Sequence, residues 1–374
     1  MNQPVHAANF AAALVAAVLG SLRTVHTDNH QRFYQLGDRS AQLEDLHALE
    51  NAPQLTAEEV FATRREIFER EVATKSLLHS LLADASSRDL LVQLAAFAML
   101  GHRRVRLPYH GPRNAALRGE LLRSADRSAQ ADADLVAAIQ EKWTTDVFSL
   151  FEIDTEEGPL RVYTIGEELY RTVHAPSYSW GSEGQAVGVR PGDMVLDCGA
   201  AFGDVSLQFA RAVGEQGHVI CFEPYPLFLR VYNENMRMNP RLADRTTLVQ
   251  RGVWHKPDET LSFIAGGGGS RIDQSNHAPL KIHTTTIDEV CAAASLPRVD
   301  FIKMDIEGAE LNALRGAERT LRRFRPRLAI CLYHSPQDFH DIPAYLHGLG
   351  LDYRLHLNHH YVNEWETVLY ASPA

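Results

Sequence analysis

The spacing of apolar positions divides the chain into a helical part and a part in which strands alternate with helices. Residues 1 to about 140 are rich in Ala, Leu, Glu and Arg and poor in runs of β-branched residues, which favours helices. Thr56-Ala-Glu-Glu has the form of a capping box and predicts a helix that continues into Leu77. The stretch 89–100 is apolar nearly all round and predicts a buried helix.

Beyond residue 147 the pattern of apolar residues predicts short strands, most of them separated by helices. Residues 148–153 and 160–164 predict a hairpin, and residues 353–357 and 367–371 predict a second, antiparallel one at the C-terminus. Five further strands are expected at residues 194–198, 219–223, 247–250, 301–305 and 328–333. The helices between them are expected to begin near Val205, Pro226, Glu307 and Gln337. This alternation is typical of a parallel sheet with right-handed crossovers.

Length and composition narrow the class of protein. A chain of 374 residues with 45% apolar and 22% charged residues predicts a globular protein of two domains. The net charge of −10 disfavours nucleic acid as the main partner. Four cysteines far apart, with no C-x-x-C pair, predict reduced, buried thiols and a cytoplasmic location. The apolar run 9–20 is too short to span a bilayer and lacks the basic start of a signal peptide, so no membrane span is expected.

A glycine-containing turn follows the first of the five strands, in the segment DMVLDCGAAFGDVS at residues 193–206. Gly199 and Gly203 open a turn between that strand and a helix, where the missing Cβ lets the backbone approach a ligand. The next strand ends at Glu223, an acidic side chain placed to accept the hydroxyls of a ribose. Dinucleotide sites use G-x-G-x-x-G, whereas Ala201 occupies the middle glycine position here.

The charge around this turn separates two classes of cofactor. Asp197 and Asp204 flank the turn, and two carboxylates repel a pyrophosphate but suit a ligand that carries an ammonium and a sulfonium. The turn therefore favours S-adenosylmethionine over NAD. The predicted cofactor-binding residues are Asp197, Gly199, Ala201, Gly203, Asp204, Glu223, Pro224, Gly252, Val253 and Asp305. Tyr178, Trp180 and Ser182 either close over the cofactor or pack as ordinary core residues.

Candidate catalytic residues lie at the ends of two later strands. The run Lys303-Met304-Asp305-Ile306-Glu307 ends one of them, and His334 follows the next. Methyl transfer to a hydroxyl requires removal of its proton, and we predict that His334 or Asp305 is the general base, with Glu307 and Lys303 as further candidates. A rival hypothesis makes Asp305, Glu307 and His334 ligands of a divalent metal, Mg, Mn or Zn; we favour the metal-free hypothesis.

These motifs together resemble the FkbM family of methyltransferases, from about Tyr178 to the C-terminus. The resemblance rests on VLDCGAAFGDVS, CFEPYP, VDFIKMDIEGAE, LAICLYHSPQD and ETVLYA. It implies transfer of a methyl group from S-adenosylmethionine to an oxygen, often on a hydroxyl of a glycan or a secondary metabolite. Residues 1 to about 140 lie outside the resemblance.

The expected fold is α/β and doubly wound. It has a mostly parallel, seven-stranded class I methyltransferase sheet with an antiparallel C-terminal hairpin, behind a mainly helical N-terminal domain. The expected domains are residues 1–140 (helical; acceptor recognition or oligomerisation), 141–180 (connecting hairpin and cofactor-closing segment) and 181–374 (cofactor binding and catalysis).

Two other functions stay open on the sequence alone. The first is an NAD-dependent nucleotide-sugar or alcohol oxidoreductase, which the acidic turn and the missing Tyr-x-x-x-Lys pair disfavour. The second is an inactive, methyltransferase-like binding protein. A small-molecule or glycan acceptor is the expected partner, and a homodimer could form through the N-terminal domain.

Overall fold

The chain divides into two compact units. The computed structural model describes residues 3–26, 56–108, 126–127, 131–141, 148–155, 158–166, 168–169, 177–181, 187–266, 270–273, 277–361 and 363–374. One unit comprises residues 1–116 and 332–369, and the other comprises residues 117–331 and 370–374. The predicted domain boundaries at residues 140 and 180 stay a prediction.

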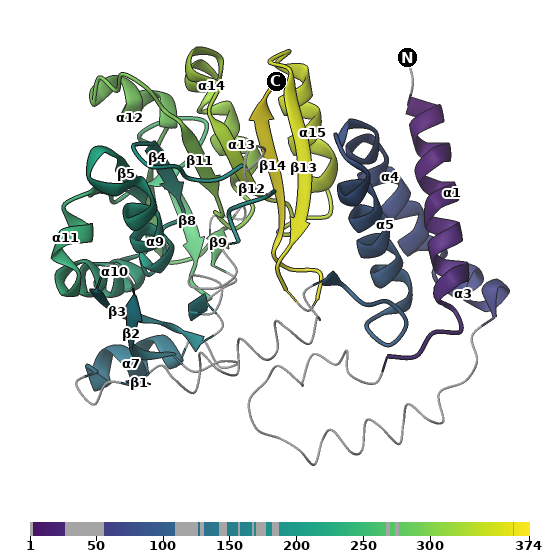
Figure 1. The fold of residues 1–374 in the computed structure, drawn as a ribbon, viewed down its shortest axis with the longest axis horizontal. Coiled ribbons are helices and arrows are strands. Elements are labelled where there is room, and N and C mark those ends of the chain that lie inside the picture. Colours follow the sequence, from purple (N-terminus) through teal and green to yellow (C-terminus); the bar gives the residue numbers. More distant parts are fainter. Residues whose placement is uncertain are drawn as a thin grey trace. The chain divides into compact units, whose positions relative to one another are not determined.

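The first unit is built around a group of packed helices. Its elements are α1 (Gln3–Ser21), α3 (Ala57–Thr63), α4 (Arg65–Leu81), α5 (Ala85–Leu100), α15 (Asp338–Gly348) and strand β13 (Tyr353–His359). Helices α1, α4 and α5 pack against one another (Figure 1). Phe10, Leu14 and Val18 lie four residues apart on α1 and are fully buried, so one face of this helix contributes to the core.

The predicted capping box forms, but the helix that it opens is short. Thr56 accepts a hydrogen bond from the backbone N–H of Glu59, and the Glu59 carboxylate accepts one from the backbone N–H of Thr56. The prediction of one continuous helix into Leu77 is wrong, because Arg64 has φ −113° and ψ 19° and separates α3 from α4. The rings of Phe61 and Phe68 pack edge to face across this bend, 5.6 Å apart.

The three C-terminal histidines, His356, His359 and His360, are buried. His356 lies in β13, and its Nδ1 is 2.7 Å from the carboxylate of Asp84, the N-cap of α5. Nδ1 of His359 is 3.0 Å from the hydroxyl of Thr367. These contacts join β13 to a helix and to the neighbouring strand, so the histidines serve packing within this unit.

The second unit begins with a hairpin that matches the prediction. Strands β2 (Phe148–Thr155) and β3 (Gly158–Ile165) pair antiparallel over their full lengths, and β1 (Asp126–Arg127) adds a short third strand. Helix α7 (Ala133–Gln140) packs on β2. The last four residues of β3 are all buried, so this end of the hairpin is covered on both faces.

The main sheet has the predicted seven strands. In chain order they are β4 (Met194–Cys198), β5 (His218–Phe222), β6 (Thr246–Val249), β11 (Phe301–Met304), β12 (Arg327–Cys331), β13 and β14 (Thr367–Pro373). Hydrogen-bonded neighbours give the order β13-β14-β12-β11-β4-β5-β6, in which β12, β11, β4, β5 and β6 are parallel. The antiparallel C-terminal hairpin β13–β14 is also as expected (Figure 1). The chain therefore has the doubly wound α/β fold.

A four-stranded sheet between β6 and β11 is absent from the sequence prediction. It consists of β7 (Gly252–Val253), β8 (Thr260–Ile264), β9 (Arg271–Ile272) and β10 (Leu280–Thr285), in the order β7-β10-β8-β9. Two of these strands have only two residues each, too few for an alternating pattern to appear in the sequence. Gly267, Gly268 and Gly269 lie outside the described residues.

Helices connect the parallel strands of the second unit. They are α9 (Asp204–Val213), the 3₁₀ turn η3 (Gly214–Gln216), α10 (Pro226–Met238), α11 (Pro240–Ala243), α12 (Ile287–Ala293), α13 (Glu310–Arg315) and α14 (Glu318–Phe324). The helix expected near Glu307 begins only at Glu310, because Glu307 has φ +56° and belongs to a bend. Strand β11 likewise ends at Met304, one residue before Asp305.

Two sequence predictions about the chain's class can be compared with the structure. All four cysteines are buried and free. Among the described residues, no helix combines the length and the apolar content that crossing a bilayer requires.

Candidate active site

Three of the predicted site residues come directly after paired positions of neighbouring strands. In the register of the sheet, Met304 pairs with Cys198, and Cys198 pairs with Phe222. The residues that follow these three are Asp305, Gly199 and Glu223. The carboxyl ends of β11, β4 and β5 therefore bring the glycine turn between two acidic residues, at the edge where doubly wound sheets bind their ligands.

The first glycine of the turn packs against the backbone of Asp305. Gly199 has φ +86°, and a Cβ built on it would lie 1.9 Å from the carbonyl oxygen of Asp305. The second glycine, Gly203, has φ +78°, and a Cβ there would lie 2.6 Å from the ring of Tyr232. Both glycines are thus required by close packing as well as by backbone conformation. Ala201, in the position of the missing middle glycine, has φ +45°.

Asp197 is buried at the end of β4 and is paired within the protein. Its carboxylate lies 3.2 Å from Nζ of Lys303 and accepts a 2.6 Å hydrogen bond from the hydroxyl of Ser206. Lys303 also donates to the carbonyl oxygen of Gly199, at 2.6 Å. Burial alone would lower the pKa of Lys303, but the carboxylates of Asp197 and Asp305 raise it above its ordinary value. Lys303 therefore stays charged, and its placement favours a positioning role for it under the turn.

Asp204 is buried on the other side of the turn. Its carboxylate accepts a 2.7 Å hydrogen bond from the hydroxyl of Thr164, in β3. Burial raises the pKa of Asp204, and the bond from Thr164 partly offsets this. We expected Asp197 and Asp204 to be charges open to a ligand. In the structure, Lys303 and Ser206 bond the carboxylate of Asp197, and Thr164 bonds that of Asp204. That these two residues bind the cofactor stays a prediction. In the structure their carboxylates support the glycine turn.

Glu223 is tied to the same turn by its side chain. One carboxylate oxygen accepts the backbone N–H of Ala201 at 3.0 Å, and the other accepts that of Tyr225 at 2.7 Å. Burial raises the pKa of Glu223 to about 7. Pro224 follows it, and a Cβ built on Gly252 would lie 3.8 Å from Pro224. Gly252 and the buried Val253 form β7, so the predicted residues after β5 and β6 lie side by side.

Asp305 is half-buried and is held by a residue far away in the sequence. The hydroxyl of Tyr178 donates a 2.8 Å hydrogen bond to its carboxylate. The Tyr178 ring lies 5.2 Å from Nζ of Lys303, a cation–π arrangement. The hydroxyl of Tyr370 in turn donates to the carbonyl of Ser177. Tyr178 therefore contacts the candidate catalytic carboxylate itself, while Ser182 lies outside the described residues.

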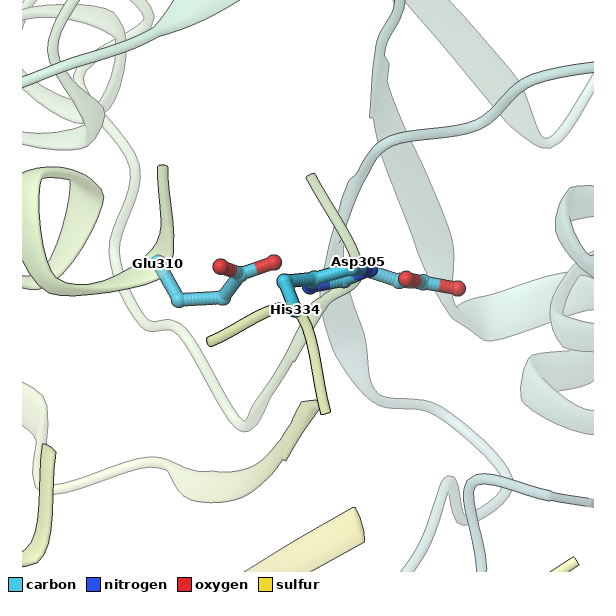
Figure 2. Close-up of side chains that lie close together, drawn as sticks. All are labelled: Asp305, Glu310 and His334. Atoms are coloured by element: carbon cyan, nitrogen blue, oxygen red, sulfur yellow. The ribbon is translucent and has the colours of Figure 1, made fainter. Parts of the chain in front are cut away.

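Glu310, the second glutamate after β11, lies beside Asp305. Carboxylate oxygens of Asp305 and Glu310 lie within 4.8 Å of each other. Glu310 is fully buried and accepts the backbone N–H groups of Ile306 and Gly308, at 2.8 and 3.0 Å. Figure 2 shows the carboxyl groups of Asp305 and Glu310. Glu310 thus stabilises the bend between β11 and α13.

His334 belongs to the other unit and comes three residues after the end of β12 (Arg327–Cys331) in the sequence. It is half-buried, and its ring lies 4.3 Å from the ring of Tyr333. Within the sheet, Ile330 of β12 pairs with Met304 of β11. The strands that precede His334 and Asp305 in the sequence are therefore neighbours in the sheet.

Several residues that support the turn or Glu223 were not predicted from the sequence. Thr164, Ser206, Asn235 and Tyr225 are four of these. Ser206 is the last residue of the segment 193–206, so its hydroxyl could have been recognised from the sequence as a partner for the turn. The others meet the turn only through tertiary packing.

Comparison with known proteins agrees with this arrangement. Residues 197–355 match the family described as the methyltransferase FkbM domain. The chain is 26% identical over 156 residues to the 2-O-methyltransferase NoeI of Sinorhizobium fredii, covering 36% of this chain and 62% of that protein. It is 44% identical over 52 residues to the C-methyltransferase UbiE of Vibrio campbellii, covering 14% of this chain and 20% of that protein.

Solved structures include a similar chain. The methyltransferase FkbM from Methylobacillus flagellatus aligns over 88% of this chain and 65% of its own length, with 20% identity and a TM-score of 0.48. The chain thus spans less than two thirds of the length of NoeI and of this structure. The family match covers the turn, Glu223, the bend after β11 and His334. The chain therefore carries a methyltransferase FkbM domain.

Proposed function

We propose that this protein is an S-adenosylmethionine-dependent O-methyltransferase that acts on a hydroxyl of a sugar, a glycan or a secondary metabolite. The observation that supports it best is the single row of strand ends where Gly199, Glu223 and Asp305 follow paired residues. At this edge of the sheet, the glycine turn at Gly199 lies between Glu223, an acidic group suited to a ribose, and the half-buried carboxylate of Asp305. The 2-O-methyltransferase name of NoeI supports oxygen as the acceptor atom.

The residues present fit the cofactor. The turn at Gly199 brings backbone to the sheet edge with no side chain in the way. Each oxygen of Glu223 already accepts one backbone N–H and has a second lone pair that can accept a ribose hydroxyl. When bound, S-adenosylmethionine supplies an electrophilic methyl carbon. The protein's task is then to hold the acceptor oxygen close to that carbon and to take its proton.

Asp305 and His334 are the candidates for the proton-accepting group. Asp305 lies directly beside the glycine turn and is oriented by Tyr178. The imidazole of His334 can accept a proton near neutral pH. We propose that one of them is the general base. Lys303 and Glu307 are assigned supporting roles in positioning the turn and the bend.

The binding of S-adenosylhomocysteine tests the cofactor assignment. Isothermal calorimetry with the purified protein is expected to show saturable binding of S-adenosylhomocysteine and none of NAD. Radiolabelled methyl transfer from S-adenosylmethionine to a panel of methyl glycosides and phenolic metabolites then tests the reaction. Binding of NAD alone would support the oxidoreductase alternative, and cofactor binding without transfer to any acceptor would support an inactive binding protein.

The affinity for S-adenosylhomocysteine is expected to depend on pH through Glu223. With the pKa of Glu223 raised to about 7, the carboxylate that accepts ribose hydroxyls is lost as the pH falls below 7. The affinity should therefore decrease about eightfold between pH 7.5 and pH 6 and level off above pH 8. Titrations at several pH values measure this. In the Glu223→Gln variant the affinity should be lower and flat across this range, and an unchanged pH dependence there would assign the effect to another group.

A metal-dependent mechanism is the second candidate for catalysis. Asp305 and Glu310 place carboxylate oxygens within 4.8 Å of each other, which favours Glu310 over Glu307 as a possible ligand. However, both oxygens of Glu310 already accept backbone N–H groups. We therefore expect methyl transfer to retain most of its rate after exhaustive dialysis against EDTA. A loss that added Mg²⁺, Mn²⁺ or Zn²⁺ reverses would establish the metal mechanism.

The N-terminal helices are assigned to acceptor recognition or to a homodimer. They lie outside the residues that match the family. Analytical ultracentrifugation of the full chain distinguishes the two roles, because only the second requires a dimer in solution.

A further inference from the structure

We propose that the β2–β3 hairpin, which precedes the family match, is part of the cofactor site, and that Thr164 and Asn235 are positioning residues for the glycine turn. The inference rests on the proposed binding of S-adenosylmethionine. It concerns Thr164 in the hairpin, which precedes the family match at residues 197–355, and Asn235, which lies within that match but outside the turn motif.

The buried side chain of Asn235 makes hydrogen bonds with three backbone groups, two on Tyr163 and one on Phe202. It lies on α10 and is fully buried. Its carbonyl oxygen accepts the N–H of Tyr163 at 2.7 Å, and its amide group donates to the carbonyl of Tyr163 at 2.9 Å. The same amide group donates to the carbonyl of Phe202 at 2.8 Å. The amide therefore pairs with β3 as a neighbouring strand would, and holds the turn at the same time.

Thr164 makes the second link between the hairpin and the turn. It is fully buried, and its hydroxyl donates to the carboxylate of Asp204, the first residue of α9. Asp204 directly follows Gly203, so this bond holds the end of the turn opposite Gly199. Because the carboxylate is buried, losing its hydrogen-bond donor costs more than losing a bond at the surface.

Aromatic packing completes the connection. The ring of Phe202, in the middle of the turn, lies 5.2 Å from Phe148 of β2 and 4.9 Å from Phe228 of α10. These residues share a buried cluster with Tyr163 and Ile165 of β3. The hairpin thus covers the outer side of the turn, and the turn's backbone depends on it for hydrogen bonds and for packing.

Hydroxyl-preserving and hydroxyl-removing variants of Thr164 test this proposal by calorimetric titration with S-adenosylhomocysteine. Thr164→Val keeps the shape of the side chain but removes the donor to Asp204, and it should weaken binding about tenfold. Thr164→Ser keeps the hydroxyl and should bind within about twofold of the unsubstituted protein. Thermal unfolding of each variant confirms that the folded protein is being titrated.

A second pair of variants covers the case in which Thr164→Val does not fold. Asn239 is the C-cap of α10, one helical turn beyond Asn235, and bonds the backbone of Arg161 in the same strand at 2.7 and 3.3 Å. It also donates to the carbonyl of Asn235 at 2.7 Å, so these hydrogen bonds join α10 to β3 and do not reach the turn. Asn239→Ala should lower the unfolding temperature without changing the affinity by more than about twofold, whereas Asn235→Ala should also weaken binding about tenfold or more. Equal affinities for all variants would overturn this proposal alone. Absence of binding by the unsubstituted protein would overturn the proposed function and this inference with it.

Discussion

The Gly199→Ala variant is expected to lose the folded glycine turn and, with it, all measurable binding of S-adenosylhomocysteine. A Cβ at this position would lie 1.9 Å from the carbonyl oxygen and 2.9 Å from the carbonyl carbon of Asp305, and backbone atoms cannot move aside as a flexible side chain can. The left-handed φ of +86° adds to the cost. Together these effects should lower the free energy of unfolding by at least about 4 kcal/mol.

Gly192→Ala is the matched control for that experiment. Gly192 has a similar φ of +83°, but a Cβ there would meet nothing within 4 Å. Its substitution should therefore cost only the conformational strain, about 1–2 kcal/mol, and leave cofactor affinity unchanged. Urea unfolding and calorimetric titration measure the two quantities separately. If both alanine variants lost stability equally, the close approach to Asp305 would not explain the glycine at position 199.

The Asp305→Asn variant is expected to lose methyl transfer by about a thousandfold while it binds S-adenosylhomocysteine within about threefold of normal, because a general base contributes mainly to the chemical step. Asparagine has the same shape, and its side-chain oxygen can still accept the hydrogen bond that Tyr178 donates. The substitution therefore removes the charge and the basicity and leaves the contact in place. Single-turnover assays with any acceptor found by the methyl-glycoside and metabolite panel measure the loss.

Tyr178→Phe separates the chemistry of Asp305 from its positioning. The variant removes only the hydroxyl that donates to the Asp305 carboxylate. Transfer should fall about tenfold, and the acid limb of the pH–rate profile should move to higher pH, because the ionised carboxylate loses a hydrogen bond. In the Asp305→Asn background the same substitution should have little further effect. Normal transfer by Asp305→Asn, with loss of transfer in His334→Ala, would assign the base to His334.

The pairing of β11 with β4 explains how the residues at the carboxyl end of β11 contribute to the site. Asp305 carries the reactive side chain, while its backbone carbonyl packs on Gly199 and its neighbour Lys303 holds the Gly199 carbonyl. Both interactions come from a strand that runs parallel to β4 in fixed register. The same two strands therefore shape the cofactor turn and place the candidate base beside it.

The sequence by itself determined the positions along the chain of the seven strands of the main sheet, the glycine turn, and the placement of Glu223, Asp305 and His334 at or after strand ends. Each of these features rests on local patterns, because a buried parallel strand is a short apolar run and its end is marked by the polar residues that follow. Parallel strands then present their carboxyl ends at one edge, so their last residues meet wherever the fold is doubly wound.

Only the tertiary structure decided which side chains support the site. Lys303 and Gly199 are 104 positions apart, Asn235 and Tyr163 are 72 apart, and Thr164 and Asp204 are 40 apart. A local sequence pattern contains no information about such pairs. The sequence therefore did not indicate that Lys303 bonds Asp197, or that Thr164 bonds Asp204. The same reason explains why the closeness of Glu310 to Asp305 was not predicted: the left-handed Glu307 redirects the chain in the bend, and that conformation depends on the packing around it.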